Sequence, residues 1–149
     1  MSTILPPLFG YEPPPSDALR DHARALYDRR LEMVTVPVVD VGTEAWRPLP
    51  QDCHGNCEAW CERNPEYQLV RGWIFLPLPG LAYSRFLSHS VVRQPDDLLI
   101  DITPRGQLRE AAPYSFIATI VSNDEYEALV VDLYEASGTG FLDHQHTAA

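Results

Sequence analysis

The sequence predicts a single α+β domain whose strands form a mainly antiparallel sheet. Its 149 residues are the length of one domain, and 45% of them are hydrophobic, enough for a core that needs no disulfides or metals. The expected order of elements is helix, strand, helix, three strands and helix. We expect residues 1–15 to form a proline-rich arm, residues 16–142 the α+β domain, and residues 143–149 a short polar tail.

The first helix is predicted over residues 17–30, because Ser16 can cap it and its apolar side chains recur at helical spacing. The β-branched run in residues 33–41 indicates a strand. Pro37 within this run cannot donate a backbone hydrogen bond, so the strand is expected at an edge or a bulge of the sheet.

The second helix is predicted over residues 53–63, since Asn64 before Pro65 disfavours a longer one. A third helix begins in the capping box of residues 122–125 and is closed by Gly138. Between these helices, strands are expected at residues 69–76, 86–93 and 98–103, followed by a loop.

The composition argues against several partners and chemistries. A net charge of −10 repels phosphate backbones, so no nucleic-acid partner is expected. All 11 basic residues are arginine, which excludes lysine Schiff-base chemistry. The most apolar region, residues 69–92, is interrupted by Arg71, Pro77, Pro79 and Arg85, so it predicts core strands and no membrane span.

The cysteines and the start of the chain indicate a cytoplasmic protein. Residues 1–7 lack the basic and apolar stretches of a signal peptide. Cys53, Cys57 and Cys61 form an odd, closely spaced set that differs from a disulfide framework. Free thiols in a reducing compartment fit this pattern, while the oligomeric state stays open.

Cys53 is the candidate nucleophile. A thiol attacks only as a thiolate, which needs a lowered pKa and a base to take its proton. The start of a predicted helix offers free N–H groups and the positive end of the helix dipole. The same N–H groups could line an oxyanion hole, with Gln51 as a side-chain donor.

His89 and Asp101 are the candidate base and its orienting carboxylate. Residues 94–97 have strong turn chemistry, so the strands on either side are expected to form a hairpin. With an odd-numbered loop centred on Pro95, opposed residue numbers would sum to about 190, which pairs His89 with Asp101 on one face. At that separation a carboxylate can hold an imidazole in the productive tautomer.

Three segments resemble the papain-like and transglutaminase-like cysteine enzymes: residues 53–56 (CHGN), 89–92 (HSVV) and 101–104 (DITP). Among these enzymes the chain looks most similar to glutamine amidohydrolases and protein deamidases. The resemblance implies a papain-like fold in which the cysteine-bearing helix packs on the sheet. It also implies a thiol hydrolase that cleaves an amide of a protein, peptide or small molecule through a thioester, without cofactor or metal.

Two neighbours of Cys53 complete the candidate site. His54 can contact substrate, although a histidine at a helix start is often simply exposed. Asn56 can orient His89 in place of Asp101 or line the substrate site, or it can brace the loop before the helix.

Two alternatives to an enzyme remain. The first is a non-catalytic acidic binding or inhibitor protein that docks on a basic surface. The second is a small zinc-binding domain using the cysteine cluster, although structural zinc sites prefer two ligand pairs and only one cluster is present. Cys57 and Cys61 lie on one stripe of the predicted helix with Cys53 and are expected to be core residues.

Overall fold

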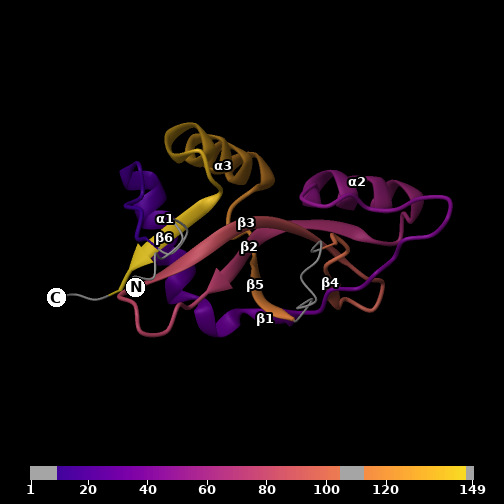
Figure 1. Cartoon of the computed structure of the whole chain (residues 1–149), viewed down its shortest axis with the longest axis horizontal. Helices are drawn as coiled ribbons and strands as arrows, with labels where there is room; N and C mark the ends of the chain where they lie inside the picture. Colours follow the sequence, from indigo (N-terminus) through magenta and orange to yellow (C-terminus); the bar gives the residue numbers. More distant parts are fainter. Residues whose placement is uncertain (1–9, 105–112, 147–149) are drawn as a thin grey trace, which may run out of the picture.

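The computed structural model describes residues 10–104 and 113–146, and within these ranges it confirms an α+β fold with a mostly antiparallel sheet (Figure 1). The helices are α1 (Asp17–Asp28), the short 3-10 helix η2 (Arg30–Glu32), α2 (Cys53–Arg63) and α3 (Asn123–Ser137). The strands are β1 (Val34–Val36), β2 (Gln68–Leu76), β3 (Tyr83–Arg93), β4 (Leu99–Ile100), β5 (Tyr114–Ala118) and β6 (Phe141–Gln145).

The α-helices begin and end close to where their local signals predict. Ser16 Oγ caps α1 by accepting from the backbone N–H of Leu19 at 3.2 Å. Ser122 Oγ caps α3 in the same way, and Gly138 ends that helix in the left-handed conformation with φ of 76°. Helix α2 covers the predicted residues, which places Cys53 at its first position.

The sheet has the order β1-β5-β2-β3-β4, and β6 also pairs with β3. Strand β6 pairs with residues 83–87 of β3, whereas β4 pairs only with Val92 and Arg93. The two edges of the sheet meet where Val38, just after β1, forms a parallel bridge with Asp101, just after β4. The sheet is therefore strongly curled around its inner face.

All three α-helices pack on the outer face of the curled sheet, and Figure 1 shows α2 and α3 on the same side of β3. Helices α1 and α3 cover a core that contains Trp73 and Phe86, and α2 buries Cys57 against Val92. The inner face holds a second core of Val36, Ile74, Val91 and Phe116. No described helix is both long and apolar enough to cross a membrane.

Two strands were missed by the sequence analysis, and two predicted strands are shorter than expected. Strand β5 lies where a loop was predicted, directly after Pro113. Strand β6 contains Asp143 and His144, so the predicted polar tail actually begins inside the sheet. Strand β1 ends before Pro37 and β4 ends before Asp101, whose backbone N–H donates to Pro37 O.

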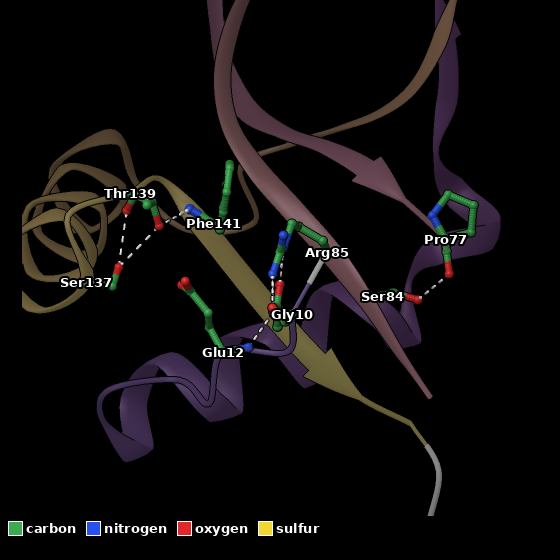
Figure 2. Close-up of polar contacts among 9 residues, drawn as sticks. Gly10, Glu12, Pro77, Ser84, Arg85, Ser137, Thr139 and Phe141 are labelled. Carbon is green, nitrogen blue, oxygen red and sulfur yellow. Dashed lines mark hydrogen bonds and ion pairs between the residues drawn. The ribbon is translucent and has the colours of Figure 1, made fainter. Parts of the chain in front are cut away.

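A buried ion pair connects β3, β6 and the start of the described chain. Arg85 donates from Nε and Nη2 to Asp143 at 2.7 and 2.8 Å, and both side chains are fully buried. Figure 2 shows that Arg85 also reaches Gly10, whose carbonyl accepts from Nη2 at 2.7 Å. The backbone N–H of Glu12 donates to Asp143 at 2.8 Å. This ion pair therefore holds residues 10–12, which belong to the predicted arm of residues 1–15, against the sheet.

Candidate active site

Cys53 is half-buried at the first position of α2, where its thiol contacts β3. Burial alone would raise the pKa of this thiol. A hydrogen bond with the His89 side chain, the charge of His89 and a hydrogen bond from the backbone N–H of Ser90 outweigh burial, so the pKa of Cys53 is lowered. His89 and the backbone of Ser90 therefore favour the thiolate form of Cys53.

His89 connects Cys53 to a buried carboxylate. Its Nε2 lies 2.8 Å from Oδ2 of Asp101, which leaves Nδ1 for the thiol. Burial would lower the pKa of His89, but hydrogen bonds to Asp101 and Cys53, together with their charges, raise it to about 9. At neutral pH the imidazole therefore carries a proton that it can deliver to a leaving group.

Asp101 is fully buried, and both of its carboxylate oxygens have hydrogen-bond partners. Its Oδ1 accepts from the backbone N–H of Thr103 at 2.9 Å, and its Oδ2 accepts from the hydroxyl of Tyr114 at 2.6 Å. Burial would raise the pKa of Asp101, but the hydrogen bond and charge of His89, with the bonds from Tyr114 and Thr103, lower it. The carboxylate therefore stays ionised where it faces the imidazole.

The predicted register of the β3–β4 hairpin is wrong, because the centre of the turn lies one residue later than expected. Asp97 donates to Gln94 O at 2.8 Å and adopts φ of 73°, so the loop is residues 95–97 and is centred on Asp96, not Pro95. The strands pair Val92 with Ile100, a sum of 192. Because this sum is also even, Asp101 keeps the predicted face, and His89 reaches it diagonally.

An interruption in sheet pairing opens β3 to Cys53. On one edge of β3, pairing with β6 ends where Ser88 donates to Gly140 O at 3.1 Å, and pairing with β4 begins only at Val92. Backbone N–H groups alternate in direction along a strand, so that of Ser90 points to the same edge as that of Ser88. No strand covers this position among the described residues, and the N–H instead bonds Cys53.

Tyr114 is a site residue that the sequence analysis did not assign. Besides its bond to Asp101, its ring packs edge-on against the ring of His89, with centroids 5.9 Å apart. Tyr114 lies in β5, which was not predicted from the sequence, so no local sequence pattern placed it beside Asp101. The only local signal was the position of an aromatic residue directly after Pro113.

Gln51 and His54 border Cys53 at the surface. Gln51 is exposed and adopts φ of 63° in the turn before α2, so its role as an oxyanion donor stays a prediction. His54 is partly exposed, with Nδ1 3.3 Å from Ser90 Oγ and Nε2 3.4 Å from Glu58. The side chain of His54 is 38% exposed, whereas that of His89 is 14% exposed.

Asn56 does not line the substrate site. It is buried, and its side chain bonds the backbone N–H and C=O of Leu49 at 2.9 and 2.8 Å and Thr103 Oγ1 at 3.1 Å. All its strong hydrogen-bonding groups face the protein, so it can neither orient His89 nor donate to an oxyanion. Asn56 instead braces the loop before α2 against the segment that follows Asp101.

Replacing Asn56 with alanine is expected to destabilise the fold by about 1–3 kcal/mol, because the backbone groups of Leu49 lose their buried partner. Urea unfolding measures this loss, with Asn123→Ala in the exposed first turn of α3 as the control. An Asn56→Ala protein of unchanged stability would contradict the bracing role.

The other two cysteines belong to the core next to α2. Cys57 is fully buried, and burial raises the pKa of both Cys57 and Cys61. All three cysteines are free thiols. Within residues 10–104 and 113–146, no group of three or more histidine, cysteine or acidic side chains is arranged to hold a metal ion. The described cysteines thus lack the converging ligands that the zinc alternative requires.

A cavity of about 530 Å³ lies between η2, β1, β5 and the β3–β4 turn. Its floor is apolar, and its rim carries Arg29, Glu32, Arg93 and Asp97. None of the three candidate catalytic residues lines it, so it is not the place where the thiol would meet a substrate.

Comparison with known proteins does not identify the chain. It has no significant match to a protein-family model, a curated protein or a solved structure.

Proposed function

We propose that this protein is a cysteine-dependent amide hydrolase of papain-like fold, with Cys53 as nucleophile, His89 as proton carrier and Asp101 as the orienting carboxylate. The observation that carries the proposal is that His89 interacts with both Cys53 and Asp101, with its Nε2 2.8 Å from Oδ2 of the buried carboxylate. A helix that begins with the nucleophile and packs on an antiparallel sheet supports the papain-like assignment.

The reaction takes place in two halves. The Cys53 thiolate attacks the amide carbonyl carbon, and the C–N bond breaks as imidazolium His89 gives its proton to the leaving nitrogen. Water then attacks the thioester while His89 takes one of its protons, the C–S bond breaks, and the acid is released. These two reaction steps need no cofactor.

The developing oxyanion needs donors at the start of α2. The first N–H groups of a helix lack intrahelical partners and point along the helix dipole. We assign the oxyanion to these groups and to the exposed side chain of Gln51. The Ser90 N–H bonds the sulfur and so stabilises the thiolate of the resting enzyme.

The substrate is a protein, a peptide or a small amide, with the side-chain amide of glutamine favoured by the sequence resemblance. A library of glutamine-containing peptides, assayed for ammonia release and for new N-termini by mass spectrometry, separates deamidation from peptide cleavage. Neither product should form with Cys53→Ala. A wild-type protein that yields neither, although its thiol is reactive, would contradict hydrolysis.

Replacing Asp101 with asparagine is expected to lower the rate of Cys53 alkylation by iodoacetamide at pH 6 by roughly tenfold. This corresponds to a rise of about one unit in the pKa of the Cys53 thiol. The amide cannot stabilise imidazolium His89 as the carboxylate does, and its NH₂ favours the wrong tautomer. Asp97→Asn, in the exposed turn nearby, is the matched control. A lower melting temperature with unchanged alkylation would remove Asp101 from the site.

A further inference from the structure

Arg71 lies on β2, next to the part of β3 that contacts the start of α2. In the β2–β3 register Arg71 is directly opposite Ser90, so the two side chains share the outer face of the sheet. Ser90 contacts both residues at the start of α2: its N–H bonds Cys53, and its Oγ lies 3.3 Å from Nδ1 of His54. A positive charge therefore stands next to the Cys53–His54 end of α2.

The guanidinium of Arg71 is held in place but not enclosed. It stacks over the ring of Tyr126 at 4.7 Å from the ring centroid, and Nη1 donates to Glu127. The Arg71 side chain is 15% exposed, whereas that of Glu127 is 56% exposed. An ion pair with so exposed a partner contributes little to stability and is readily exchanged for another carboxylate.

The hydrogen bonds of Arg71 with the described parts of the chain leave part of its guanidinium unpaired. Its Nε is buried and has no hydrogen-bond partner among the described residues. The position provides a guanidinium oriented by Tyr126 and Glu127, on a side chain that is 15% exposed.

We propose that Arg71 binds a carboxylate of the substrate, so that the amide cleaved at Cys53 belongs to a molecule carrying a carboxylate close to that amide. This inference rests on the proposed function. Glu127 is the resident counterion, which the substrate carboxylate displaces. A guanidinium pairs with a planar carboxylate through two hydrogen bonds, and in a chain of net charge −10 an anionic substrate needs such an anchor.

Two alkylating agents of similar size test the anchor without knowledge of the substrate. Iodoacetate carries a carboxylate next to its reactive carbon, and iodoacetamide carries a neutral amide. The quantity measured is the ratio of their rates at Cys53, divided by the same ratio for glutathione. We expect Arg71→Gln to lower this ratio by roughly three- to fivefold, the effect of one ion pair, while the iodoacetamide rate changes less than twofold.

Glu127→Gln provides the opposite test on an exposed side chain. It frees Arg71 from its counterion and is expected to raise the same ratio, whether or not Arg71→Gln folds. Arg20→Gln, which removes an exposed ion-paired arginine of α1, should leave both rates unchanged.

The outcomes separate the two proposals. Fast iodoacetamide labelling in all variants, with a ratio unchanged in Glu127→Gln or in folded Arg71→Gln, overturns the carboxylate anchor alone. Slow labelling of wild-type Cys53 by both reagents, with the pH dependence of a free thiol, overturns the proposed function and the anchor with it. A ratio that falls in Arg71→Gln and rises in Glu127→Gln supports the anchor.

Discussion

Replacing His89 with glutamine is expected to lower the rate of Cys53 alkylation by iodoacetamide at pH 6 by roughly a hundredfold, since a thiol with an ordinary pKa of about 8.5 is then almost entirely protonated. Glutamine can fill the space of the imidazole but carries no charge. The half-buried Cys53 then loses the partner that offsets its burial, and its pKa rises. The lower nucleophilicity of a low-pKa thiolate reduces the difference without removing it.

The pH dependence gives this prediction a sign. In the wild type the pKa of Cys53 is lowered and that of His89 is raised to about 9, so the pH range of the ion pair is bounded above by about 9 and below by the lowered pKa of Cys53. The alkylation rate should be nearly constant across neutral pH and fall in acid as the thiolate is protonated. In His89→Gln the rate should instead rise about tenfold per pH unit through neutrality.

Cys53→Ser identifies the labelled residue, because Cys57 and Cys61 are also free thiols. With that serine in place, fast labelling at pH 6 should disappear. Equal rates for wild type and His89→Gln at pH 6 would contradict the ion pair.

Replacing Asp143 with alanine is expected to destabilise the protein by about 3–5 kcal/mol, because it leaves the fully buried Arg85 charge without its partner. Glu12 also loses the carboxylate that accepts its backbone N–H. Urea unfolding measures the loss, and Asp17→Ala, which breaks an exposed ion pair, should cost less than about 1 kcal/mol.

Removing both charges distinguishes the pair from simple packing. Arg85→Met combined with Asp143→Leu should recover much of the stability lost in Asp143→Ala, since no buried charge is then left unpaired. A loss below about 1 kcal/mol in Asp143→Ala would mean that solvent reaches Arg85 and that the ion pair is not buried in solution.

The parts of the fold that local chemistry determines could be predicted from the sequence. Helix α2 ends at Arg63 because Asn64, as the residue before Pro65, disfavours the helical conformation. The capping serines of α1 and α3 are local in the same sense. The side of the sheet that carries His89 and Asp101 depends only on the parity of the turn, which an odd-numbered loop preserves.

The remainder depends on contacts that no local pattern encodes. The exact offset of the hairpin is set by Asp97 adopting a left-handed conformation, one residue away from the expected centre of the turn. Tyr114 joins the site only because β5 pairs with β2, and Asp143 reads as a polar tail residue until Arg85 is placed beside it. Asn56 lies three residues after Cys53 in the sequence, which suggested a site residue. Its actual hydrogen-bond partner, Leu49, lies in an irregular loop that no sequence pattern could place.

The long separations between paired segments bear on how the chain folds during synthesis. The bond from Glu12 to Asp143 spans 131 residues, and β1 finds its partner only in β5. While the ribosome is still making the middle of the protein, β1 has neither neighbour nor cover, and Cys53 has no completed pocket. Contacts this distant are slow to form, so refolding is expected to be slow for a domain of this size. The contacts of Asp101 with His89 and Tyr114 would thus form late, once β5 has joined the sheet.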